Sequence, residues 1–462
     1  MGVNYYLHSL STLEKNKIDM KHLITITRYE FRHFARSPFK ITALLLFLGA
    51  AIYGLQNGYE LFKKQLAETE NIKSKNEETI AEVISWYDAG KKGPDDKPWI
   101  DVTTPMRAIW YAPASAIKEP SKMMPFSIGQ AEQFGYYKQV TNWSSTFDAD
   151  LSEEMANPER LAIGTLDFSF IIIYLLPVLL IILLFNIGGL EKDLNFDRLV
   201  QVNNPSFSTW LLARFIFYFF LIIALLLVLM LVYAALTNAL FDLSGTFLNM
   251  YLLVLFYTFL WFAVFYYINL KGKGSANQAI KMASIWLMFA VIVPGATHQI
   301  LSLKYPASYM TDYLDASRDE TYKIYDLPAD TVMKKLLVHY PELQATKLAK
   351  DTVMDEGIIG NSSSGLINKL MKDAAKQIED SNESKNQFIR NTSWINPVNW
   401  FQNTMNRLSE TDYYAYQKFR VEIQKMIDKK VKFILNDSWN KETIDREKFL
   451  EYVEAFKTET EK

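Results

Sequence analysis

Residues 215–241 read FIFYFFLIIALLLVLMLVYAALTNALF, a run of 27 positions without Asp, Glu, Lys or Arg. A helix of about 20 apolar residues crosses the hydrocarbon layer of a membrane, so this run is long enough to span it. The alternative is a buried helix of a large soluble protein. Core helices seldom stay uncharged on every face over such a length, and the run therefore predicts a membrane span.

Apolar runs of the same kind occur on both sides of this one, and the shortest of them, 41–56, is extended by residues that suit the membrane interface. The hydrophobic residues are thus concentrated in a few runs and the rest of the chain is polar. For this reason a chain with 50% hydrophobic residues has a mean hydropathy of only -0.02. We predict a mainly α, polytopic α-helical membrane protein with about five transmembrane helices and a two-segment extracytoplasmic domain. The predicted spans are residues 41–60, 166–187, 214–241, 247–270 and 279–303. The predicted extracytoplasmic segments are residues 61–165 and 304–462.

The distribution of cations predicts the orientation, because Lys and Arg are enriched on the cytoplasmic flanks of spans. Residues 1–40 contain seven Lys and Arg against three acidic residues. We therefore expect a cytoplasmic N-terminus and a cytoplasmic loop over 188–213, with both long polar segments outside. Met20 is an alternative start to Met1. Residues 22–35 separate Arg28 and Arg32 from an apolar face that includes Ile26 and Tyr29, which predicts a helix lying on the membrane surface; an ordinary start of the first span is the alternative.

The two outer segments have different patterns. Residues 60–86 lack Gly and Pro and predict a helix that continues the first span outward, before a loop rich in both residues. An aromatic run over 99–147 is typical of a small aromatic core, with stacking on sugars or lipids as the alternative. Helices are predicted over 328–352, 364–390 and 408–456, and residues 361–365, NSSSG, are predicted to form a loop.

No catalytic, metal or cofactor site is predicted. The chain has no Cys, its five His residues are scattered, and it contains no glycine-rich phosphate loop and no nucleophile motif. The net charge of -2 gives no reason to expect nucleic acid as a partner. The span interiors lack the charged groups of ion-coupled carriers, and Asp167, Arg214 and Lys281 are expected at span ends, satisfied by water or by snorkelling. These observations predict a protein that is not an enzyme and that draws energy, if any, from another subunit.

Several stretches, in this order, are similar to ABC-2 type transporter permeases, in the branch with a large extracytoplasmic insertion after the first span. The matching stretches are RYEFRHFARSPFKITALLLFLGAAIYGLQNG (28–58), FSIGQAEQFGYYKQV (126–140), NPERLAIGTLDFSFIIIYLLPVLLIILL (157–184) and GSANQAIKMASIWLMFAVIVPG (274–295). The resemblance implies a permease subunit in a bacterial inner membrane, a second permease subunit as a homo- or heterodimer partner, and a separate cytoplasmic ABC ATPase subunit. Members of this branch usually close with another membrane helix, whereas residues 304–462 contain no uncharged run of that length.

The resemblance also assigns the contact with the ATPase to the loop between the second and third spans. In the family this loop begins with an E-x-E-x-G pattern, continues as a leucine-rich helix and reaches a proline, here Pro205. Asn195 occupies the expected glycine, and Asn tolerates left-handed backbone geometry better than most residues. Without the family, the loop is a short amphipathic helix of mixed charge. The residues assigned to ATPase coupling are Glu191, Lys192, Asp193, Asp197, Arg198 and Leu199.

Two functions of different classes follow. The first is a transport permease, an exporter energised by the separate ATPase, with unknown cargo. The second is a membrane-anchored envelope interaction protein without transport activity. A stable complex with an ATPase favours the first, and exclusively outer partners favour the second.

Overall fold

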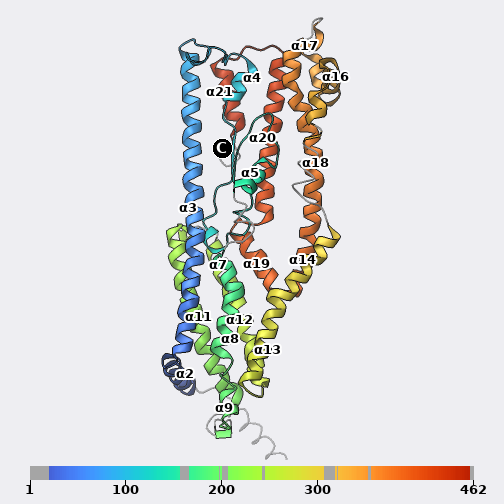
Figure 1. Cartoon of the computed structure of the whole chain (residues 1–462). Coiled ribbons are helices and arrows are strands. Elements are labelled where there is room, and N and C mark those ends of the chain that lie inside the picture. The colour runs from blue at the N-terminus through green and yellow to red at the C-terminus, as the bar shows by residue number, and fades with distance from the viewer. Residues whose placement is uncertain are drawn as a thin grey trace, which may run out of the picture.

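The computed structural model describes residues 20–156, 166–196, 198–199, 206–241, 245–305, 318–319, 321–351 and 355–457. Over these residues the chain is mainly helical and forms an elongated molecule, with one helical bundle above another (Figure 1). The lower bundle contains the predicted spans. The upper one, which we call the distal body, contains residues 100–156, 324–351, 355–395 and 413–456 together with the second half of α3.

Helix α3 (Pro38–Asp88) connects both parts as a single helix of 51 residues. At 1.5 Å per residue it is about 76 Å long, more than twice the thickness of the hydrocarbon layer. Pro38 starts it at a position where a missing amide donor costs nothing. The helix predicted for residues 60–86 is therefore confirmed as the upper half of α3, which runs the length of the molecule in Figure 1.

Four helices are long and apolar enough to cross a membrane, and this supports a helical, multi-pass membrane protein. They are α3, α11 (Phe207–Leu236), α12 (Thr246–Lys271) and the continuous helix Ser275–Lys304. The second predicted span, residues 166–187, corresponds to the apolar helix Phe168–Leu184, which is shorter than 18 residues. Helix α11 begins at Phe207, seven residues before the predicted span, because the side chain of Ser206 caps it by accepting a hydrogen bond from the Thr209 amide at 3.1 Å.

Both spans that contain an internal proline change from α to π geometry just before it. The second span consists of α7 (Phe168–Phe170), a π turn η2 (Ile171–Leu175) and α8 (Leu176–Leu184), with Pro177 near the start of α8. The last span consists of α13 (Ser275–Leu287), a π turn η4 (Met288–Ile292) and α14 (Val293–Lys304), with Pro294 near the start of α14. A π turn accommodates the carbonyl that proline leaves without a donor, so the disturbance stays local.

The distal body has one hydrophobic core built from both predicted outer segments. Buried side chains from α3 and residues 100–149 pack against those of α16, α18, α20 and α21. Its described elements are α4 (Pro105–Tyr111), β1 (Ser115–Ile117), η1 (Met124–Phe126), β2 (Tyr137–Gln139), α5 (Asp148–Ala156), α16 (Ala329–His339), η5 (Pro341–Ala345), α17 (Lys347–Lys350), α18 (Glu356–Thr392), η6 (Ser393–Ile395), α20 (Tyr413–Trp439) and α21 (Arg446–Phe456). Strands β1 and β2 pair antiparallel, with Ser115 opposite Gln139. The aromatic run is partly core, since Phe126 and Phe147 are fully buried, whereas Trp99 is 67% exposed.

The predicted loop NSSSG is wrong, because residues 361–365 lie inside α18. Each serine hydroxyl donates to a carbonyl one turn earlier, for example Ser362 Oγ to the Ile358 oxygen at 2.7 Å, which leaves the helix intact. The small side chains also allow a close approach, and Trp439 Nε1 of α20 donates to Ser362 Oγ at 2.9 Å. A run of polar serines is typical of a loop, but in this protein it forms part of the contact between α18 and α20.

The predicted helices 328–352 and 408–456 are also each broken into shorter helices. The prediction missed α19 (Pro397–Leu408), which leaves the distal body and packs on α12. The rings of Phe401 and Tyr257 stack with centroids 4.2 Å apart, and those of Trp400 and Phe256 meet edge to face at 5.7 Å. This helix anchors the second outer segment to the spans.

Candidate functional site

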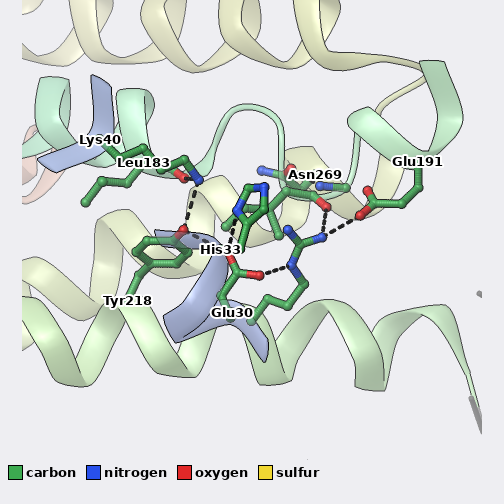
Figure 2. A network of polar contacts seen from close by, with 10 residues as sticks. Glu30, His33, Lys40, Leu183, Glu191, Tyr218 and Asn269 are labelled. Carbon is green, nitrogen blue, oxygen red and sulfur yellow. Dashed lines mark hydrogen bonds and ion pairs between the residues drawn. The ribbon is translucent and has the colours of Figure 1, made fainter. Parts of the chain in front are cut away.

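A buried arginine joins three separate parts of the chain at the lower end of the bundle. Arg214 lies in the second turn of α11, and its Nε donates to Glu30 Oε2 of α2 (Met20–Ala35) at 2.6 Å. Its Nη1 donates to Glu191 Oε1 of α9 (Leu190–Asp193) at 2.7 Å and to the Ile187 carbonyl at 2.8 Å. Figure 2 shows Glu30 and Glu191 on opposite sides of this guanidinium group. We call these contacts the Arg214 bridge.

The bridge extends to the first and second spans through a tyrosine and a lysine. Tyr218, one turn after Arg214, donates its hydroxyl hydrogen to Glu30 Oε1 at 2.7 Å. Lys40 Nζ of α3 donates to the Tyr218 hydroxyl and to the Leu183 carbonyl of α8, both at 2.9 Å (Figure 2). The network thus links α2, α3, α8, α9 and α11.

Charge balance explains why these groups can be buried. Glu30, Lys40 and Arg214 expose 4%, 3% and 7% of their surface, and Glu191 is half-buried. Two carboxylates and two cations compensate one another, which a buried charge requires. Burial by itself raises the pKa of Glu30, but the Arg214 charge and the hydrogen bonds from Arg214 and Tyr218 outweigh it, so the pKa lies below the ordinary glutamate value.

The three charged side chains of α9 each contact a different part of the bundle. Glu191 reaches α11, and Lys192 Nζ donates to the Gly272 carbonyl after α12 at 2.6 Å. Asp193 Oδ2 accepts from the Ser275 amide at 3.1 Å. Ser275 is the first residue of α13, so Asp193 satisfies an amide that has no partner within its own helix. One turn of helix is thereby tied to three spans.

The backbone approaches closely at two glycines of this junction, and at Gly189 the approach requires the absence of a side chain. A Cβ added to Gly189 would lie 2.5 Å from the Ser275 amide nitrogen. The Gly188 amide donates to Asn269 Oδ1 of α12 at 3.1 Å, and the Gln278 side chain of α13 donates to the Asn269 carbonyl at 3.2 Å. The GG pair before α9 therefore lets the loop lie directly against the α12–α13 turn.

Asn195 adopts the left-handed backbone conformation, with φ of 59°. The Phe196 amide donates to the Glu191 carbonyl at 2.8 Å, and the Asn195 amide to the Lys192 carbonyl at 3.2 Å. This is the Schellman pattern that ends a helix. The prediction that the turn survives with Asn is confirmed.

The side chains after α9 face outward. Leu194, Phe196 and Leu199 are 54%, 56% and 62% exposed, and Arg198 is exposed as well. Arg198 and Leu199 have helical backbone geometry, whereas Asp197 and Pro205 lie outside the described residues. Of the predicted coupling residues, Glu191, Lys192 and Asp193 thus contact this chain, and Arg198 and Leu199 point to solvent. Their role in coupling stays a prediction.

Sequence reasoning missed Glu30, Lys40, Tyr218 and Asn269. The expectation that Arg214 and Asp167 are satisfied by water or snorkelling is wrong, because they are only 7% and 8% exposed; Lys281 is exposed as expected. A signal was available for Glu30, which falls between Ile26 and Phe34 at helical spacing on the face of α2 that packs on the bundle. An acidic residue on an apolar face needs a partner. Tyr29, assigned to that face, is instead 64% exposed.

Among the residues that the structure describes, no group of three or more His, Cys, Asp or Glu is arranged to hold a metal ion. The polar groups at the lower end form one hydrogen-bonded network. This arrangement can transmit a displacement between α9, α2 and the spans.

Comparison with known proteins gives one match. The family described as Domain of unknown function (DUF3526) matches residues 313–457, which is less than half of the chain and covers the second outer segment. No curated protein and no solved structure matches. The match carries no function with it.

Proposed function

We propose that this protein is the permease subunit of an ABC transporter, an exporter energised by a separate ATPase subunit that docks on residues 188–213. The N-terminus and this loop lie in the cytoplasm, and the distal body lies outside. The observation that carries the proposal is the Arg214 bridge. It connects the short loop helix α9 to α2 and α11, which a docking loop needs if movement of a partner is to reach the spans.

Different residues of the loop bind the ATPase and transmit its movement to the spans. The ATPase binds the outward side chains Leu194, Phe196 and Leu199 together with Arg198, an apolar patch with a cation beside it. Buried apolar contacts supply most of the energy of such interfaces. Glu191 and Asp193 then act as positioning residues, passing displacement of α9 to α11 and α13.

A second permease subunit completes the transporter. In the most apolar stretch of the span Ser275–Lys304, only 11% of the residues are buried. The corresponding share is 33% to 39% in the other three long spans. Its exposed side chains include Ile280 at 67% and Val291 at 48%. In a membrane such a face contacts lipid or another helix, and we propose the second subunit there.

Co-purification tests the function directly. The full chain is expressed with an ABC ATPase encoded beside it, and the ATPase retained on the tagged permease is measured. The variant Phe196→Glu is expected to lower retention at least tenfold, because it places a charge in the apolar patch. The matched control is Phe241→Glu, which changes a Phe that is also exposed, 78% accessible, in the turn 239–241 that follows the far end of α11.

Equal retention by Phe196→Glu and the wild type would contradict docking on this loop. Recovery of envelope partners only, with no ATPase, would favour the alternative of a membrane-anchored interaction protein. Cargo movement that persists after deletion of the ATPase would exclude the energised permease.

A further inference from the structure

A groove lies between α2 and α11 at the lower end of the bundle, beside the Arg214 bridge and distinct from it. Its volume is about 610 Å³. One wall is formed by Ile24, Arg28 and Phe31, which share a face of α2 at helical spacing, and the other by Ile216 and Phe217 of α11. The groove is thus apolar inside, and Arg28 is the charged residue among those that line it.

The two faces of α2 are used differently. Glu30 and Phe34 are buried toward the bundle, whereas Ile24 and Phe31 are 63% and 57% exposed. The Phe31 ring meets the Phe217 ring edge to face, with centroids 6.3 Å apart. The wall is held in place by this contact while its apolar surface stays accessible.

Arg28 has no acidic partner within ion-pair distance in the part of the chain that the structure describes. The nearest acid along the chain, Glu30, lies on the buried face and is already bonded to Arg214 and Tyr218. Arg32 and Arg36 are exposed on the same helix, outside the groove, and neither forms an ion pair with another described residue. An occupant with an apolar chain and a negative group complements both properties.

We propose that the groove binds an anionic phospholipid of the cytoplasmic leaflet, with an acyl chain between Phe31 and Ile216 and its phosphate on Arg28. Guanidinium groups bind phosphate oxygens through two parallel hydrogen bonds. A helix that lies in the interface places its cations at headgroup depth and its apolar side chains among the first acyl carbons. The inference needs the membrane location but not the ATPase, so its failure is distinguishable from failure of the proposed function.

The test uses the full chain in detergent, titrated with dioleoyl phosphatidylglycerol or dioleoyl phosphatidylcholine while the unfolding temperature is recorded. The wild type is expected to respond to phosphatidylglycerol at about fivefold lower concentration, the effect of one cation near a headgroup. Arg28→Gln removes this preference and Arg28→Lys keeps it. The control Arg36→Gln, which lies outside the groove, leaves it unchanged.

A second pair of variants tests whether an acyl chain binds in the groove. Ile24→Trp fills the groove from an exposed position and is expected to abolish the response to both lipids, while Leu45→Trp, at an equally exposed position of α3, does not. The proposal is overturned if Arg28→Gln and Arg36→Gln behave alike, or if Ile24→Trp responds as the wild type. A change in the number of chains per particle in Ile24→Trp would assign the groove to a second protein copy and equally overturn it.

Discussion

Two buried arginines in this protein make the same set of contacts in different surroundings. Arg214 joins Glu30 and Glu191, and a tyrosine, Tyr218, also bonds one of these carboxylates. In the distal body, Arg420 of α20 donates to Glu379 Oε1 at 2.6 Å and to Asp150 Oδ2 at 3.3 Å, and Tyr413 bonds Glu379. We call the second set the Arg420 bridge. Each bridge connects elements far apart in sequence.

The two bridges differ in how many other packing contacts surround the arginine. The guanidinium of Arg420 lies 5.3 to 5.5 Å from the centroids of the Phe134, Phe147 and Tyr413 rings, inside the distal body. Arg214 has one such neighbour, Trp210 at 4.7 Å, and joins two short helices to the end of a span. The Arg420 bridge belongs to a packed core, whereas the Arg214 bridge is a main attachment of α9. The same chemistry therefore suits permanent assembly in one place and transmission of movement in the other.

Replacing Arg420 is expected to have the largest effect on stability. Arg420→Met leaves the buried Asp150 and the half-buried Glu379 without their cation, and breaking a buried pair in this way typically costs about 3–5 kcal/mol of unfolding free energy. Thermal unfolding of the full chain in detergent measures the loss. The control Lys372→Met breaks the exposed ion pair with Asp428 and should cost at most about 1 kcal/mol. Equal losses for both variants would show that the Arg420 bridge contributes no more than a surface pair.

Replacing Arg214 is expected to cost less stability and more function. In a double-mutant cycle, Glu30→Gln and Arg214→Gln should show a coupling energy of about 1–3 kcal/mol, because the groups are in direct contact. Glu191 and Glu379 are similarly half-buried, so the smaller loss is expected because the Arg214 bridge lies near the end of the bundle and not in a packed core. If the proposed ATPase subunit docks as we propose, its ATP hydrolysis should fall severalfold in Arg214→Gln and stay unchanged in the control Lys281→Gln. Unchanged hydrolysis in a folded Arg214→Gln protein would remove the Arg214 bridge from the coupling path.

The two bridges should respond to acid in opposite directions. Burial raises the pKa of Asp150 to about 6, although Arg420 and the Gly135 amide lower it. Between pH 6 and about 4 the folded state therefore binds a proton that the unfolded state does not, and the contribution of Asp150 to stability grows as pH falls. Relative to Asp150→Asn, the wild type should gain up to about 3 kcal/mol between pH 7 and pH 4.

Glu30 gives the opposite sign, because its pKa in the folded state lies below the ordinary value. Its contribution is present above the unfolded pKa and is lost as pH falls through the folded pKa. Relative to Glu30→Gln, the wild type should lose stability on acidification below about pH 4.5. The stability difference between wild type and Asp150→Asn and that between wild type and Glu30→Gln should therefore change in opposite directions with pH. Changes in the same direction would contradict the contrast between the bridges.

The sequence predicts features that a single stretch of chain determines. Long uncharged runs predict the spans, and the lack of Gly and Pro predicts the upper half of α3. The left-handed turn at Asn195 is implied by the resemblance to permeases that have a glycine there, because Asn tolerates this conformation. Pairs such as Glu30 with Arg214, 184 residues apart, depend on how α2 packs against α11. No local pattern states that geometry. The prediction of a loop at the serine run in α18 is wrong for the same reason, since the partner of Ser362 lies on another helix.

The smallest expected effect concerns the turn that ends α9. Asn195→Ala places a residue with a Cβ and no side-chain amide at φ of 59°, which costs about 1 kcal/mol. Asn195→Gly has no such penalty and serves as the matched control. If α9 transmits movement, the Ala variant should lower hydrolysis by the bound ATPase more than its small loss of unfolding free energy suggests, because the strain lies between the docking side chain Phe196 and the Arg214 bridge. Equal hydrolysis by the Ala and Gly variants would mean that the geometry of this turn does not matter for coupling, and that Asn195 only ends a helix.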